Sequence, residues 1–208
     1  MLLDKVRLIR SRWVAKVFTA LVATALAFGL SACQQVVVLA LNQITTTHFE
    51  VRDDRLLMSG EINSKTLDQF EQVIALNPNI KTLVELNVPG SLDDDTMIAL
   101  AYRVRELGLN THLTATSEIY SGGVDLFLAG VQRTMEPGAK IGVHSWSDGT
   151  KEAKDFPRDA PEHEQNRRYI ERMLGDDKFY WFTIYAASAD DIHLMTETEI
   201  ADYGLLSE

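Results

Sequence analysis

The sequence predicts an α/β fold built on one mostly parallel sheet, and two observations carry this prediction. From Arg55 to the C-terminus, short apolar or β-branched runs of strand length alternate with segments whose apolar residues recur at helical spacing. Glycine, proline or asparagine separates many of these segments. Because strands and helices alternate, we expect right-handed crossovers between parallel strands.

The expected strands share a high content of β-branched and aliphatic residues over strand length. They are 35–41, 44–50, 55–62, 82–86, 111–116, 132–135 and 140–145. The last of these begins sharply after Pro137-Gly138. The segment 149–159 is polar, charged and without period, so we expect a surface loop or a flap there.

Each expected helix has a recognisable start or stop. The helix over 65–76 ends at Asn77-Pro78, and the helix over 92–107 is closed by Gly108. A short apolar helix starts at Ser121 and stops at Gly130. A long helix over 161–187 is expected to bend or split at 175–177, and a final helix through 202 carries a capping box at its start, from Thr196 to Glu199.

Residues 1–32 have the pattern of a signal peptide, with five basic side chains before an apolar run of 14 residues that is too short to span a bilayer. The following Leu30-Ser31-Ala32-Cys33 resembles the lipobox of bacterial lipoproteins, and Cys33 is the only cysteine. This resemblance implies cleavage before Cys33 and a lipid anchor of acyl chains such as palmitate. Gln34 then suggests the outer membrane, facing the periplasm. The alternative is an uncleaved signal anchor.

Without residues 1–32, the chain has 15 basic and 29 acidic side chains, and its formal charge shifts from −10 to −14. Such a surface repels phosphate, so we expect no nucleic-acid partner. The composition is that of a globular protein, and we expect a tether with strands over 33–54 and one domain over 55–208. Neither metal nor other cofactor is expected, because the histidines lack metal-binding spacing and a single cysteine forms no cluster.

Three short motifs carry candidate chemistry. Ser121 stands between a strand and a buried helix and is followed by two glycines, so it is either an N-cap or a nucleophile beside helix N–H groups. Gly90-Ser91 follows Pro89 at the carboxyl end of a strand, where α/β sheets bind ligands; the alternative is a plain turn. His144 ends an apolar strand, as either a packed side chain or a base.

Five motifs in order resemble the Clp protease/crotonase-like superfamily, and within it the periplasmic, Clp-protease-like predicted hydrolases. They are 57–62, 87–94, 120–130, 137–144 and 196–205. The resemblance covers about three quarters of the chain. It implies the repeated ββα fold of that superfamily and, because relatives often form trimers, hexamers or rings, a homo-oligomer of unspecified number.

The resemblance also implies a serine hydrolase in which Ser121 is the nucleophile and His144 the general base. Gly122, with Gly90 or Ser91, would supply the N–H groups of the oxyanion hole. For the third member of a triad, Asp191 matches best and Asp190 is second; both can equally be turn residues after the long helix.

The function expected from these observations is a lipid-anchored cell-envelope serine hydrolase, most simply a peptidase with a peptide or ester substrate. The loop over 149–159 closely follows His144, so we expect it to govern substrate access. Two alternatives stay open. One is a catalytically inactive scaffold or binding lipoprotein with the same fold, and the other is crotonase-type thioester chemistry, which is disfavoured because coenzyme A esters are not expected outside the cytoplasm.

Overall fold

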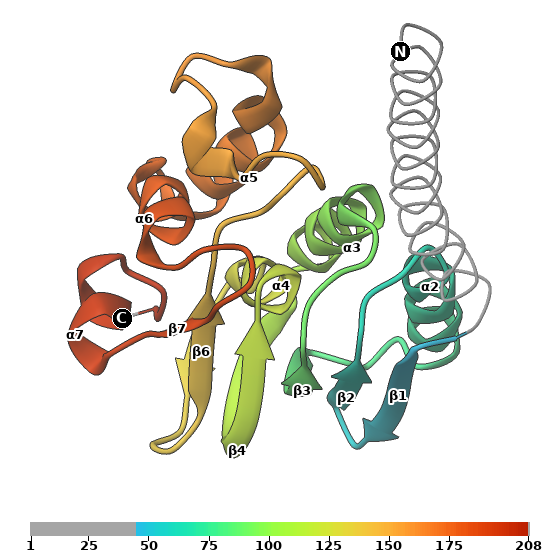
Figure 1. The fold of residues 1–208 in the computed structure, drawn as a ribbon. Coiled ribbons are helices and arrows are strands. Elements are labelled where there is room, and N and C mark those ends of the chain that lie inside the picture. Colours follow the sequence, from blue (N-terminus) through green and yellow to red (C-terminus); the bar gives the residue numbers. More distant parts are fainter. Residues whose placement is uncertain (1–44, 208) are drawn as a thin grey trace, which may run out of the picture. The chain divides into compact units, whose positions relative to one another are not determined.

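The computed structural model describes residues 45–207. Within this range, one sheet is flanked by helices, as Figure 1 shows, so the α/β prediction is confirmed. The signal peptide, Cys33 and the strand expected over 35–41 lie outside the described residues.

The strands of the described range form a single mixed sheet in the order β1-β2-β3-β4-β6-β7, with β5 also paired to β4. Parallel pairing joins β2 to β3, β3 to β4, and β4 to both β5 and β6, whereas β1 and β7 are antiparallel edge strands. Their bounds are β1 (Thr47–Arg52), β2 (Arg55–Gly60), β3 (Thr82–Val88), β4 (Asn110–Tyr120), β5 (Arg133–Met135), β6 (Lys140–Val143) and β7 (His193–Leu194).

The helices begin and end close to the expected residues. Their bounds are α2 (Thr66–Leu76), α3 (Asp94–Glu106), α4 (Gly122–Leu128), α5 (Glu164–Leu174), α6 (Lys178–Ala186) and α7 (Glu197–Asp202). The long helix is split at Gly175, whose φ of 94° is left-handed, and Thr196 and Glu199 form the expected capping box of α7. No helix of residues 45–207 has the length and apolar character needed to cross a membrane.

Helix α4 lies in the centre of the core. Its side chains Val124, Leu126, Phe127 and Leu128 are each at most 1% exposed. A Cβ atom on Gly123 would lie 2.6 Å from the carbonyl oxygen of Val88, so only glycine lets α4 approach β3 this closely. Burial of each large apolar side chain stabilises the fold by about 1.5–3 kcal/mol, which fixes the start of α4 firmly against the sheet.

Strand β4 is longer than the expected 111–116, because it continues to Tyr120. The polar stretch Thr114–Glu118 does not alternate like a strand, but β4 lies between β3 and β6. Its irregular middle is held by the Ser117 hydroxyl, which hydrogen-bonds the Glu85 carbonyl. Hydrogen bonds from neighbouring strands therefore extend the strand beyond what its side-chain pattern predicts.

Candidate active site

The candidate site lies at the carboxyl edge of the sheet, where three parallel strands end. Val88 pairs with Ile119 between β3 and β4, and Tyr120 pairs with Gly142 between β4 and β6. The strands therefore end side by side, and the segments that follow them meet. These segments contain Gly90, Ser91, Ser121, Gly122 and His144.

Ser121 occupies a strained turn between β4 and α4. Its φ of 51° and ψ of −124° are rare for a residue with a side chain and cost roughly 1–3 kcal/mol. The turn is held by its N–H, which donates to the carbonyl of Gly142 at 3.1 Å. The hydroxyl does not cap α4 and has no hydrogen-bond partner among the described residues. Ser121 therefore occupies the N-cap position of α4, but its side chain does not cap the helix.

The Gly90-Ser91 turn lies directly against Ser121 and Gly122. A Cβ atom on Gly90, whose φ is 148°, would lie 3.9 Å from the Ser121 hydroxyl oxygen, and a Cβ atom on Gly122 would lie 3.2 Å from the Ser91 nitrogen. The turn is fixed by Ile62, whose N–H donates to the Gly90 carbonyl at 3.0 Å. Within residues 45–207, the N–H groups of Ser91 and Gly122 have no acceptor. Two adjacent donors are thus available beside the serine.

His144 and Ser121 line the same small cavity, of about 60 Å³. His144 Nδ1 lies 2.7 Å from the carbonyl oxygen of Ser145. Because a carbonyl oxygen only accepts hydrogen bonds, Nδ1 carries the proton and Nε2 is left as the basic nitrogen of the neutral ring. No hydrogen bond joins Ser121 and His144 in the described structure.

Helix α6 holds the segment that carries His144. The N–H of Ser145 donates to the carbonyl of Ala187 at 3.0 Å, and the indole N–H of Trp146 donates to the Tyr180 hydroxyl at 3.0 Å. These contacts fix the backbone on the C-terminal side of His144. Ser145, whose carbonyl orients the imidazole, is therefore itself held in place.

Among the described residues, Asp191 forms no hydrogen bond or ion pair with His144. The Asp191 carboxylate accepts a hydrogen bond from the N–H of Ile192 at 2.8 Å, and both Asp190 and Asp191 are exposed. The group that contacts the imidazole is instead the Ser145 carbonyl. The role of Asp191 in a triad stays a prediction without a contact that supports it.

Two acidic residues that the sequence analysis did not assign to the site also line the cavity: Asp125, on α4, and Asp94, in the first turn of α3. Burial and the nearby Asp94 raise the pKa of Asp125 to about 7. Burial, together with Asp93 and Asp95, raises the pKa of Asp94. The sequence did hold a signal, because Asp125 is the one charged residue in the apolar stretch 122–130.

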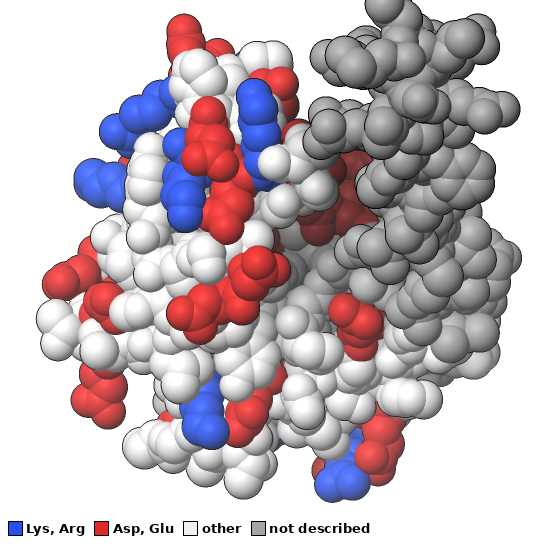
Figure 2. Space-filling view, viewed as in Figure 1, with Lys and Arg blue, Asp and Glu red and all other residues white. Residues whose placement is uncertain are grey.

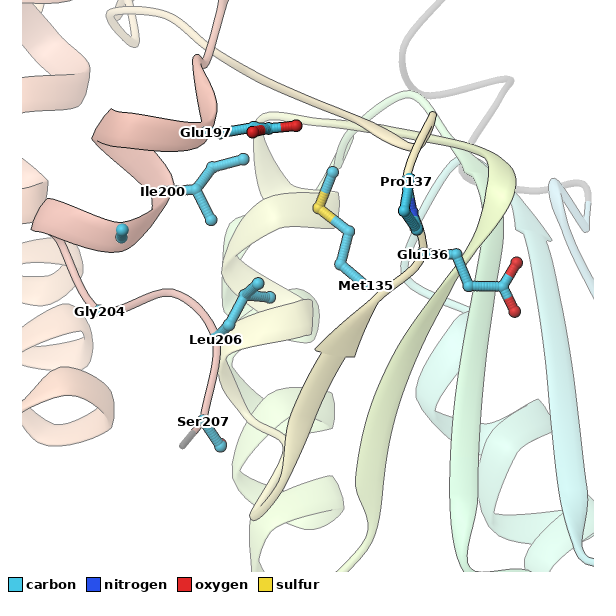
Figure 3. A pocket seen from close by; sticks show the side chains of 9 residues that line it. Met135, Glu136, Pro137, Glu197, Ile200, Gly204, Leu206 and Ser207 are labelled. Carbon is cyan, nitrogen blue, oxygen red and sulfur yellow. The ribbon is translucent and has the colours of Figure 1, made fainter.

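A larger cavity, of about 530 Å³, lies between β5 and the C-terminal segment (Figure 3). Its walls are mostly apolar, with Met135, Ile200 and Leu206 among them. Its one serine, Ser207, accepts a hydrogen bond from the Arg133 N–H, and no histidine lines it. Ser121 and His144 thus line the smaller cavity and not this one.

The segment 149–159 is more ordered than a simple surface loop. Ala153 is fully buried within a short 3₁₀ turn, Ala153–Asp155. The Phe156 ring lies 5.5 Å from the ring of Trp146, which lines the small cavity. The segment is thus packed next to the site, and its control of substrate access stays a prediction.

No family model and no curated protein matches the chain. Solved structures do. The chain is similar to ClpP1 from Listeria monocytogenes, with 19% identity and a TM-score of 0.54 over 74% of this chain and 89% of that one. It is also similar to a mutant 1510-N membrane-bound stomatin-specific protease in complex with a substrate peptide, with 20% identity and a TM-score of 0.51 over 73% and 71%. The chain therefore has the Clp-protease-like fold, as the sequence motifs predict.

Proposed function

We propose that this protein is a serine hydrolase of the peptidase type, with Ser121 as nucleophile and His144 as general base. One observation carries the proposal. The unpartnered Ser121 hydroxyl stands on a strained strand-to-helix turn, in one cavity with His144 and beside the free N–H groups of Ser91 and Gly122. A peptide as substrate is supported by the fold, which is shared with a protease whose structure contains a substrate peptide.

The proposed reaction is acyl transfer in two steps. His144 Nε2 takes the proton of Ser121 while the serine oxygen attacks the substrate carbonyl. The N–H of Gly122 and that of Ser91 or Gly90 stabilise the negative oxygen of the tetrahedral intermediate. His144 then protonates the leaving amine or alcohol, and water activated by the same nitrogen hydrolyses the acyl-serine. The Ser145 carbonyl holds the imidazole tautomer that these steps require.

Reaction with a fluorophosphonate probe tests this proposal. The full-length chain in detergent is expected to be labelled at Ser121, whereas Ser121→Ala and His144→Ala are expected to lose the label. Ser121→Gly is a useful second control, since glycine accepts the observed φ without strain and the variant lacks only the hydroxymethyl group. Labelling that persists in Ser121→Ala, or none in the folded wild type, contradicts the proposal.

A second candidate function is a binding or scaffold lipoprotein that has the fold without catalysis. Two observations within the described residues favour it: neither Asp191 nor Ser121 is hydrogen-bonded to His144. Absence of labelling in a folded wild-type protein would favour this function. Assembly into a homo-oligomer fits either candidate and stays a prediction.

For the location, we propose a lipid anchor at Cys33 in the cell envelope, facing the periplasm. The support is the sequence Leu30-Ser31-Ala32-Cys33 after a basic and apolar segment. Mass spectrometry of the protein from a Gram-negative host is expected to find a chain that starts at an acylated Cys33, and Cys33→Ser is expected to remain an unprocessed precursor. A mature chain that retains residues 1–32 with an unmodified Cys33 contradicts the anchor.

A further inference from the structure

Carboxylates stand beside the proposed nucleophile. Asp125 is half-buried on α4, four residues after Ser121, and Asp94 lies at the exposed edge of the same cavity. Asn166, from α5, lines the same cavity. Ser121 and His144 line the same cavity, so a ligand that contacts the carboxylates also lies beside the proposed nucleophile and base.

Neither carboxylate is neutralised by the protein. Among residues 45–207, no lysine, arginine or histidine forms an ion pair with Asp94 or Asp125. Figure 2 shows that, on the face of the molecule drawn there, basic side chains gather mainly around α5. On that helix, Arg167 and Arg168 are paired with Glu164. The negative charge of the cavity is therefore uncompensated.

This charge affects the proposed reaction. Asp125 lies in the first turn of α4, near the N–H groups that would stabilise the oxyanion, so in its ionised form it opposes the negative charge of the intermediate. Burial raises the pKa of the Asp125 carboxyl, as expected for an acid that lacks a positive partner. A cation in the cavity would offset the repulsion of the oxyanion and would stabilise the ionised form of Asp125. An anionic substrate would increase the repulsion.

We propose that the cavity selects substrates with a positively charged side chain, a primary ammonium such as that of lysine, held by Asp94 and Asp125. This inference rests on the proposed serine hydrolase function. An ammonium group offers three donors, and the two carboxylates offer oxygens that accept them. The cavity is small, of about 60 Å³, so a compact charged group suits it better than a bulky one.

The test compares matched tripeptide esters that differ in one side chain: lysine, Nε-acetyl-lysine, leucine or glutamate. The full-length wild type in detergent is expected to cleave the lysine ester with a kcat/KM about 10- to 100-fold above that for acetyl-lysine, as for a charge-assisted hydrogen bond. Asp125→Asn is expected to reduce this ratio to about threefold or less. Asp68→Asn is the matched control, because Asp68 is an exposed acid outside the cavity, and it is expected to retain the wild-type ratio.

A binding measurement separates failure of this inference from failure of the hydrolase proposal. The Ser121→Ala variant is titrated by calorimetry with the lysine and acetyl-lysine tripeptide amides, which requires no turnover. Binding of the lysine peptide at least about tenfold tighter, with the difference lost in Ser121→Ala/Asp125→Asn, supports the cationic site even if no ester is cleaved. Equal binding of the two peptides, or a preference unchanged by Asp125→Asn, overturns it.

Discussion

Replacing Glu85 by methionine is expected to raise the free energy of unfolding by about 1–3 kcal/mol at pH 8, because the change removes an unsatisfied buried acid. Glu85 lies in the middle of β3, is 0% exposed, and neither carboxyl oxygen has a hydrogen-bond partner in the described structure. Its neighbours in the sheet, Met58 and Leu113, are fully buried apolar residues. Methionine has a similar length and suits these surroundings.

The effect of Glu85 on stability depends on pH. Burial raises the pKa of Glu85 well above its usual value, so the folded chain holds the proton more tightly than the unfolded chain. The stability from this group is complete below the unfolded-state pKa and is lost as pH rises towards the folded-state pKa, by about 1.4 kcal/mol per pH unit. The stabilising effect of Glu85→Met is therefore expected to be larger at pH 8 than at pH 5.

Urea unfolding of the full-length chain, followed by tryptophan fluorescence at pH 5 and pH 8, measures this difference. Glu162→Met is the control, because Glu162 is exposed and its replacement is expected to change stability little at either pH. If Glu85→Met destabilises the protein at pH 8, or changes stability equally at both pH values, then the buried Glu85 carboxyl does not lower the free energy of unfolding as expected.

The positions of the main site residues follow from the sequence for a simple physical reason. Parallel strands end at a common edge, so a residue just after each strand is brought to that edge whatever the details of packing. This places Ser121, His144 and the Gly90-Ser91 turn together. The strain at Ser121 was not predictable, because its φ depends on how α4 packs against the sheet.

Other positions near the site depend on loops or on distant helices, and the sequence pattern does not specify them. The position of Asp191 is set by a short irregular segment before β7, a strand of only two residues that has no recognisable pattern. Tyr180 reaches the cavity because α5 and α6 fold back at Gly175, and the sequence does not specify that angle. Charge in an apolar helix, as at Asp125, is the kind of local signal that does indicate such a site.

Substitution of Gly122 by alanine is expected to slow fluorophosphonate labelling by about 100- to 1,000-fold, the cost of losing an oxyanion donor. A Cβ atom at this position would lie 2.6 Å from Ser91 Cβ and 3.2 Å from Ser91 N. These contacts are too close, so the Gly90-Ser91 turn must move away from α4. The two N–H groups would then no longer converge on one oxygen.

The double variant Gly122→Ala/Ser91→Gly distinguishes this steric cause from a general loss of structure. Glycine at position 91 removes the atom in the closest contact, so the turn can return and much of the labelling rate is expected to recover. Ser91→Gly alone is the control, since it removes the same Cβ atom together with the hydroxyl, which accepts a hydrogen bond from Asp93 N–H at 3.0 Å. Wild-type labelling by Gly122→Ala would mean that this N–H does not serve the reaction. A folded double variant without recovery would mean that displacement by Ser91 is not the cause.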